Sequence, residues 1–208
     1  MSQKADTRFR REPKRGSHDF DLACEVLDAG KICHVGFTQN EQPYVVPMAC
    51  ARMGDQLLIH GSIASRMVKN LASGLSCCAT MTHFDGLVYA RSTFNSSMNY
   101  RSVMVFGIAR LIEEIDEKRA SVQALVDHLM PGRRSDLRMS TIKELNATSM
   151  LALPIETFST KIRTGPPEDT KSDLDAEVWA GVVPSTLTAG EPIDAPNILP
   201  GLDRPDYL

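Results

Sequence analysis

Six short apolar runs, separated by polar turns, dominate the first half of the sequence. Pairs typical of turns, such as Gln39-Asn40 and Gly54-Asp55, stand between them. Short runs at this spacing are typical of antiparallel strands, because parallel strands need longer crossover connections. The pattern therefore predicts an antiparallel barrel. The runs cover residues 32–37, 44–50, 56–60, 75–81, 87–92 and 101–112.

Two segments have the apolar spacing and the flanking residues of helices. Residues 19–28 are preceded by Ser17, the expected N-cap, and are followed by Gly30. In residues 116–130 apolar side chains recur at helical spacing until Pro131-Gly132 ends the helix. This second helix is expected to be scaffold.

A third helix is expected between the third and fourth strands, beginning near Ser62 or Ser65. It places a helix N-terminus at the rim of the predicted barrel. Later in the chain, residues 150–158 return to a strand that Pro154 interrupts, as at a sheet edge or a bulge.

Three regions follow from this pattern. Residues 1–18 form a polar arm, residues 19–164 hold the strands and helices, and residues 165–208 form an extended tail that is irregular from residue 186 onward. Residues 1–15 carry six cations against two anions, whereas the tail carries two cations against nine anions. Both ends are expected to be solvated, with an electrostatic contact between them as the alternative.

The composition is that of an ordinary globular protein. At 208 residues, 42% of them hydrophobic, the chain is long enough for one domain with a proper core. A net charge of -3 argues against nucleic-acid binding, which needs a basic surface. No apolar stretch approaches the roughly 18 residues of a membrane span, and the basic start lacks the apolar core of a signal peptide. We therefore expect a cytoplasmic protein.

The five cysteines are odd in number and lie mostly in apolar runs, which favours reduced, buried thiols over a disulfide framework. The adjacent Cys77 and Cys78 are expected on opposite faces of a strand. The histidines show no paired spacing with the cysteines, so no metal site is expected.

One segment carries a candidate anion site. A strand from Leu57 to His60 is followed by a small-residue turn and then by a helix on which Arg66 and Lys69, three residues apart, share a face. Small residues let a backbone approach an anion, and guanidinium groups bind phosphate in a bidentate manner. A plain N-cap is the alternative that this segment alone leaves open.

Further motifs follow in order along the chain. Together with the segment 57–70 and with Asn99 to Gly107, they resemble the pyridoxamine 5'-phosphate oxidase-like flavin-binding proteins, the split-barrel family that includes the nitroimidazole reductases. The resemblance covers roughly residues 8 to 185. The other motifs are Arg15, Cys33-His34-Val35-Gly36-Phe37, Pro43-Tyr44-Val45-Val46-Pro47, Asp85-Gly86-Leu87-Val88, Ala90-Arg91-Ser92, Pro131-Gly132-Arg133, Lys161-Ile162-Arg163-Thr164-Gly165-Pro166-Pro167 and Val178-Trp179-Ala180-Gly181-Val182-Val183-Pro184.

This resemblance implies a fold and an assembly. The fold would be mainly β (α+β), a six-stranded antiparallel split β-barrel of the FMN-binding type with peripheral helices. Residues 19–164 would be the flavin-binding domain, and the tail would pack on this domain or on a partner subunit. The family also implies a homodimer with two flavin sites at its interface.

The resemblance also implies which residues contact the flavin. Arg66 is the best phosphate ligand, while Met67 stands where many relatives carry lysine, so that Lys69 compensates only in part. His60 is expected at the flavin phosphate or ring edge, and Trp179 is expected either to close over the flavin or to anchor the tail. The full set is Val46, Pro47, Met48, Ala49, His60, Gly61, Ser62, Ser65, Arg66, Met67, Lys69, Tyr100, Arg101, Ser102 and Trp179.

Two strands of that set have separate expected roles. Residues 46–49 would run under the isoalloxazine ring and offer backbone groups to its polar edge, and Pro47 predicts an irregular strand there. Alternation places Tyr100 and Ser102 on one face and Arg101 on the other. Ser102 would face the flavin, and pairing across the dimer is the alternative role of Arg101.

The resemblance makes flavin-dependent oxidoreduction of a small molecule the leading hypothesis. FMN is the expected cofactor, FAD would fit with its adenylate outside the same cradle, and NAD(P)H or another donor would reduce it. No catalytic residue is identified. The arginine-rich C-terminal motif of pyridoxamine 5'-phosphate oxidases is missing, since this tail is acidic. The alternative is a non-catalytic flavin- or haem-binding module.

Overall fold

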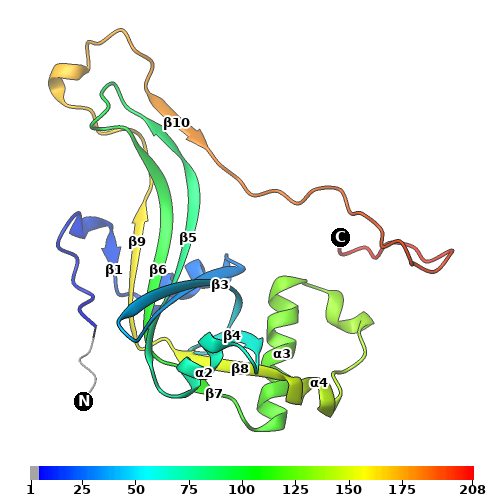
Figure 1. The fold of residues 1–208 in the computed structure, drawn as a ribbon. Helices are drawn as coiled ribbons and strands as arrows, with labels where there is room; N and C mark the ends of the chain where they lie inside the picture. The colour runs from blue at the N-terminus through cyan, green and yellow to red at the C-terminus, as the bar shows by residue number, and fades with distance from the viewer. Residues whose placement is uncertain (1–4) are drawn as a thin grey trace.

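The computed structural model describes residues 5–208 and shows a strongly curved antiparallel sheet with helices packed around it (Figure 1). Lys4, one of the cations counted in the arm, lies outside the described residues. The strands are β1 (Gly16–Ser17), β2 (Ile32–Gln39), β3 (Gln42–Met53), β4 (Gln56–Ser62), β5 (Ser76–Tyr89), β6 (Ser97–Ile108), β7 (Arg110–Leu111), β8 (Thr148–Pro154), β9 (Thr157–Arg163) and β10 (Gly181–Pro184). The α-helices are α1 (Phe20–Asp28), α2 (Arg66–Ala72), α3 (Ile115–Leu129) and α4 (Ile142–Ala147), and the 3-10 turns are η1 (Pro13–Arg15), η2 (Arg133–Asp136) and η3 (Lys171–Asp173).

Within these residues the sheet has the strand order β1-β9-β6-β5-β2-β3-β4-β8-β7, and β10 pairs with β5 outside this path. Strands β5, β6 and β9 stand upright, while β3, β4 and β8 lie across their base (Figure 1). The arrangement confirms the mainly antiparallel split-barrel class. The expected number of six strands was wrong, since the sheet has ten.

Two predicted strands, 75–81 and 87–92, are a single strand β5 that ends at Tyr89. The polar residues between them stay in the sheet because they pair with β6, where His83 lies opposite Arg101. The ladder shifts register between Phe84 and Gly86, and Gly86 adopts φ 152°. A side chain there would also meet the carbonyl oxygen of Val183 at 2.6 Å, so a glycine is needed where β10 joins the sheet.

The predicted strand 150–158 is instead two strands, because the chain turns at Ile155-Glu156 immediately after Pro154. Proline cannot donate to a ladder, which suits the last position of β8. β8 then pairs with β4 and β7, whereas β9 crosses to pair with β6 and β1.

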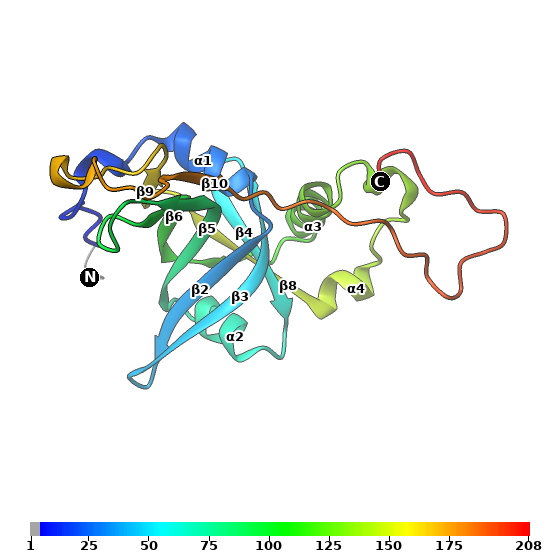
Figure 2. The same cartoon turned by 90° about the horizontal axis from the view of Figure 1, so that it is seen from above.

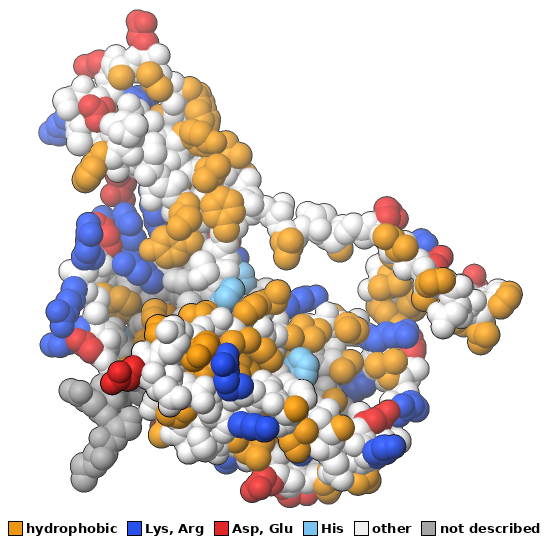
Figure 3. Space-filling model, in the orientation of Figure 1, with side chains coloured by type: hydrophobic (Ala, Val, Ile, Leu, Met, Phe, Trp, Pro, Cys, Tyr) orange, Lys and Arg blue, Asp and Glu red, His pale blue; other side chains and the backbone are white. Residues whose placement is uncertain are grey.

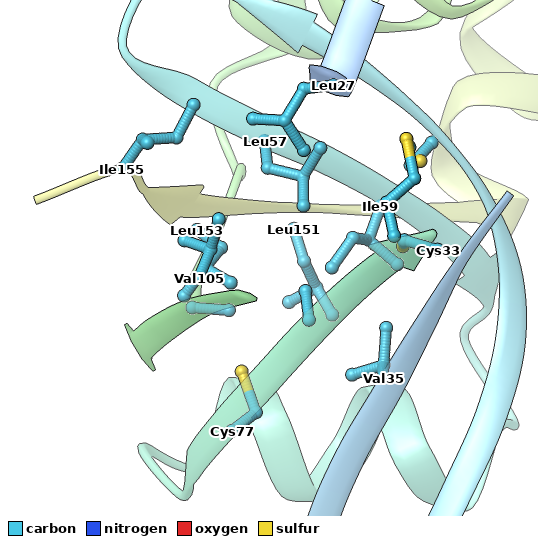
Figure 4. Packing of buried hydrophobic residues seen from close by; sticks show 14 of the residues in the cluster. Leu27, Cys33, Val35, Leu57, Ile59, Cys77, Val105, Leu151, Leu153 and Ile155 are labelled. Carbon is cyan, nitrogen blue, oxygen red and sulfur yellow. The ribbon is translucent and has the colours of Figure 1, made fainter. Parts of the chain in front are cut away.

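The main core lies inside the curve of the sheet (Figure 4). Leu57 and Ile59 of β4 point into it together with Leu151 and Leu153 of β8, and Leu27 of α1 closes one side. All five side chains are at most 2% exposed. Burial on this scale is the main source of stability, at about 25 cal/mol per Å² of apolar surface removed from water.

A second cluster lies on the opposite face of β4 and β8. Leu58, Met150 and Ile112 are fully buried there, with Val122 of α3 packed against them. Because α3 covers this face, β4 and β8 are buried on both sides. Their apolar residues therefore follow one another directly instead of alternating with polar residues. The scaffold role expected for α3 is therefore confirmed.

The helix ends show one correction and one omission. The N-cap of α1 is Asp19, whose carboxylate accepts the Leu22 N–H at 2.9 Å; Ser17 instead accepts the Asp19 N–H at 3.0 Å. The Ser17 N-cap was therefore wrong. Helix α4, which no sequence pattern above predicts, begins with a reciprocal capping box of Thr141 and Glu144.

The tail contacts the rest of the chain near its two ends (Figure 2). Arg91 donates to Asp169 at 2.8 Å, and β10 pairs with the outer part of β5. Residues 186–208 hold no helix or strand, which confirms the irregular tail. At the far end the Tyr207 hydroxyl donates to Asp136 at 2.7 Å and accepts from Arg133 at 2.7 Å, which fixes the C-terminus beside η2.

All five cysteines are free; Cys77 is buried and Cys78 is partly exposed, as their alternation along β5 predicts. Among residues 5–208, none of the helices has the length and apolar character needed to cross a membrane.

Candidate functional site

The predicted anion site is a short turn between β4 and α2. The Ser65 N–H donates to the Ser62 carbonyl at 2.9 Å, and the Ser62 hydroxyl accepts the Ala64 N–H at 3.2 Å. Ser65 occupies the N-cap position of α2, as predicted, yet its side chain makes no capping hydrogen bond. The Ser65 hydroxyl therefore remains free to bind a ligand.

Arg66 and Lys69 are exposed on α2, and no carboxylate in residues 5–208 forms an ion pair with either of them. The Arg66 guanidinium lies 4.3 Å from the centroid of the Tyr44 ring, which itself stacks on Phe37. This cation-π contact holds the guanidinium at the turn, where a phosphate could accept its hydrogen bonds.

The residues beside Arg66 explain the local sequence. Met67 and Val68 are buried in the main core, so the Met67 side chain points away from any ligand at the turn. Only its backbone could contribute to a site. A side chain at Gly61 would lie 2.7 Å from Val68, and glycine is therefore required for α2 to pack against the end of β4.

In the strand segment Val46, Pro47, Met48 and Ala49, successive side chains point alternately toward the core and away from it. Val46 and Met48 pack partly against the core, whereas Pro47 is exposed opposite His34 of β2. The β2–β3 register runs without a break through Pro47, so the predicted irregularity was wrong. Here β3 has a partner strand on one side only, and the N–H that proline lacks can face the open side without breaking the ladder.

His60 lies on the face of β4 that α3 and α4 cover. It lines a cavity of about 230 Å³ together with Glu144, Thr148 and Met150. Its Nδ1 atom is buried and has no hydrogen-bond partner among the described residues. No contact that the structure shows joins His60 to Arg66. The two are nevertheless close in the sequence, since only four residues separate Arg66 from Gly61, which follows His60.

Tyr100, Arg101 and Ser102 alternate along β6 as predicted. Arg101 forms a two-pronged ion pair with Asp85 of β5, at 2.8 and 3.0 Å, so its partner is in the same chain. The Ser102 hydroxyl donates to the Lys161 carbonyl at 3.2 Å, and Tyr100 lies opposite Phe84.

The Arg101 hydrogen bonds lower the pKa of Asp85 from its ordinary value of 3.8. A lowered carboxyl pKa stabilises the fold above pH 3.8, and this contribution is lost as the pH falls through the lower pKa of the folded state. Arg101→Met is expected to reduce the free energy of unfolding by about 0.5 kcal/mol near pH 7, since both side chains are partly solvated. Urea unfolding of both proteins at neutral and strongly acidic pH measures this; an equal difference at both pH values would contradict the assignment.

Trp179 stands on the outer end of the upright sheet and is 65% exposed. Its ring lies 5.7 Å from that of Tyr89, and it also covers Gly181 at the start of β10. The predicted site residues thus form separate groups on α2, β6 and the tail. No hydrogen bond, ion pair or ring contact joins these groups within the described chain.

Three residues of interest were absent from the predicted set. Tyr44 fixes Arg66, and alternation along β3 places it on the same face as Val46, which could have revealed it. Asn70 has a buried amide nitrogen without a partner, and His34 is an exposed imidazole without one in residues 5–208. Their sequence context carries no comparable signal.

The curved antiparallel sheet, with the basic α2 turn at its rim, defines a split barrel. The family model described as pyridoxamine 5'-phosphate oxidase matches residues 20–162, and the chain belongs to this family. No curated protein matches the sequence.

Solved structures agree with this family. The FAD and heme binding protein from Mycobacterium smegmatis is 39% identical, with 93% of this chain and 95% of that chain covered and a TM-score of 0.89. The flavocytochrome Anf3 from Azotobacter vinelandii is 37% identical, with 97% and 94% covered and a TM-score of 0.91. A candidate 5-nitroimidazole antibiotic resistance protein from Bacteroides thetaiotaomicron VPI-5482, 22% identical over 71% of this chain and 86% of its own, shares the fold at a TM-score of 0.61.

Proposed function

We propose that this protein is a cytoplasmic, homodimeric flavin-binding oxidoreductase that acts on a small molecule. The flavin is FMN or FAD, and NAD(P)H serves as the electron donor. The observation that carries the proposal is the pair of exposed cations Arg66 and Lys69 on α2. No carboxylate in residues 5–208 pairs with either of them, and the Ser65 hydroxyl at the same turn makes no capping hydrogen bond.

The residues fit a flavin phosphate. Arg66 and Lys69 would bind its oxygens, Ser62 and Ser65 would add hydroxyl groups, and Tyr44 would keep the Arg66 guanidinium in place. When bound, the flavin supplies hydride and electron transfer, which protein side chains cannot perform alone. The chain itself would bind the phosphate through the α2 turn.

A second copy of the chain would complete the site, because Ser102 and Trp179 have no contact with the α2 turn in one chain. The outward face of the sheet suits such a partner. Ile32 of β2 and Val45 of β3 are 57% and 66% exposed, and Ile108 of β6 is also exposed. Exposed apolar residues on one sheet face support the proposal of an interface there.

Release and identification of the bound cofactor tests the flavin assignment. Absorbance peaks at about 370 and 450 nm and a released mass of FMN or FAD are expected. A protein purified under conditions that retain cofactors, yet colourless and without released flavin, would contradict the proposal.

The single tryptophan reports on the tail. If Trp179 of one copy covers the ring, bound flavin should quench its emission, and removal of the flavin should restore it. A chain truncated before Trp179 should stay folded, because residues 165–208 add little to the core, and should retain flavin less well. Identical emission with and without flavin would leave Trp179 as an anchor on Tyr89.

Haem is a second candidate cofactor. Two relatives with more than 90% of this chain aligned are described as a FAD and heme binding protein and as a flavocytochrome. His34 would hold the haem iron through its imidazole: it is exposed on the apolar outward face beside Pro47, and it has no hydrogen-bond partner in residues 5–208.

Loading the protein with haemin is expected to give a Soret band that His34→Ala removes or shifts strongly, because the iron would lose its imidazole ligand. His18→Ala, which changes a histidine already bonded to Thr7, is the matched control. An unchanged spectrum in His34→Ala would exclude this ligand.

A further inference from the structure

A second cavity lies between the N-terminal arm and the outward face of β6 and β9. It has a volume of about 300 Å³, at the lower end of the range for small-molecule sites. Its floor is formed by Ser102, Met104 and Phe106, and Phe9 contributes an aromatic wall. We call it the arm pocket.

The rim of the arm pocket is strongly basic. Arg8, Arg10, Arg11 and Lys161 line it, against a single carboxylate from Asp6. Asp6 pairs with Arg8 at 2.8 Å and with Arg10 at 3.1 Å. Figure 3 shows lysine and arginine side chains gathered on this flank of the molecule.

The arm pocket therefore keeps a net positive charge after all of its ion pairs are counted. Hydrogen bonds from Arg8 hold the pKa of Asp6 well below its usual range, so Asp6 stays anionic and neutralises one cation. Arg11 has no carboxylate partner in residues 5–208, and Lys161 donates only to the Arg11 carbonyl at 3.1 Å. The pocket thus keeps an excess of three positive charges above an apolar floor.

The arm is held in place by specific contacts. β1 pairs with β9 through Gly16 and Lys161, and His18 bonds to the Thr7 carbonyl at 3.1 Å. The Phe9 ring lies 4.9 Å from the His18 ring and fills the space above Gly16, where a Cβ atom would come within 2.3 Å of it. The pocket is therefore formed before any ligand arrives, which reduces the entropic cost of binding.

We propose that the arm pocket binds the phosphate-bearing end of the small molecule that exchanges a hydride with the flavin. This inference rests on the proposed function, because Ser102, the residue expected to face the flavin ring, is part of the pocket floor. A reactant whose phosphate is held by Arg11 and Lys161, with Arg8 adding to the positive charge of the rim, would reach from the pocket toward that ring. The substrate class is an amphipathic phosphate ester, either the reduced dinucleotide donor or a phosphorylated acceptor.

Isothermal calorimetry of pyrophosphate binding tests the pocket without any flavin chemistry. The full-length protein should bind pyrophosphate at low ionic strength, and Arg8→Gln/Arg11→Gln should weaken this at least about tenfold. Arg134→Gln, which removes a cation outside the pocket, should leave binding unchanged. Gly16→Leu keeps every charge but displaces Phe9, and it should weaken binding as well.

Equal pyrophosphate affinity in wild type and in both pocket variants would overturn the inference. Flavin content of the same samples separates the two proposals, since absent flavin with pocket-dependent pyrophosphate binding contradicts the proposed function and leaves the arm pocket as an anion site. In flavin-loaded protein, a raised KM for NADPH in Arg8→Gln/Arg11→Gln identifies the donor as the occupant. An unchanged KM for NADPH together with weakened pyrophosphate binding assigns the pocket to a phosphorylated acceptor.

Discussion

Replacing Arg66 with alanine is expected to weaken flavin binding by about 1.5–3 kcal/mol, which corresponds to about ten- to a hundredfold in Kd. In the proposed site the guanidinium would be the strongest phosphate ligand of the α2 turn, and it lies 4.3 Å from the Tyr44 ring. Lys69 would remain and would compensate in part, as a single point charge without the bidentate geometry of arginine. Quenching of flavin fluorescence on titration of the apo-protein measures the loss.

Arg138→Ala provides the matched control for this experiment. Arg138 is an exposed arginine that pairs with Glu144 beside α4, away from the α2 turn. Its removal should leave flavin affinity unchanged. If Arg66→Ala folds normally and binds flavin as well as the wild type, Arg66 does not belong to the site.

A single charge on the outward sheet face should abolish both dimer and flavin binding. Val45→Asp places a carboxylate where a side chain is 66% exposed in the free chain, so the monomer fold should tolerate it. In an apolar dimer interface the same carboxylate would be desolvated without a partner, which costs several kcal/mol. Light scattering during size exclusion should then report the 22.9 kDa monomer, without flavin.

Ile142→Asp tests whether a carboxylate in place of any exposed apolar residue would abolish the dimer and flavin binding. Ile142 is 53% exposed at the start of α4, where an acidic residue suits a helix N-terminus. This variant should remain a flavin-loaded dimer. Val45→Asp would refute the proposed interface if it also stayed dimeric.

Much of the fold could be predicted because local patterns and tertiary context agree. β2, β4 and α3 were found within a few residues, since their apolar spacing matches the layers that they bury. The fusion of two runs into β5 could not be predicted, because only pairing with β6 keeps its polar residues extended. The capping box at Thr141 is readable from the sequence, so α4 is an element that the sequence could have predicted.

The candidate site was less accessible to sequence reasoning. The α2 turn and its cations were found because small residues and charges at helical spacing have a direct physical meaning. Burial of Met67 and the position of His60 behind β4 depend on how α2 and α3 pack, which spacing alone does not encode. The arm pocket was invisible for the same reason, since β1 pairs with β9 across more than 140 residues of sequence.

The central claim is that two copies of this chain share each flavin site. Native mass spectrometry of the purified holoprotein tests it most directly, because it reports assembly and cofactor content in one spectrum. The expected species has twice the 22.9 kDa chain mass plus two flavins. Any monomer that Val45→Asp produces should lack flavin. A monomer that carries a flavin would contradict the claim.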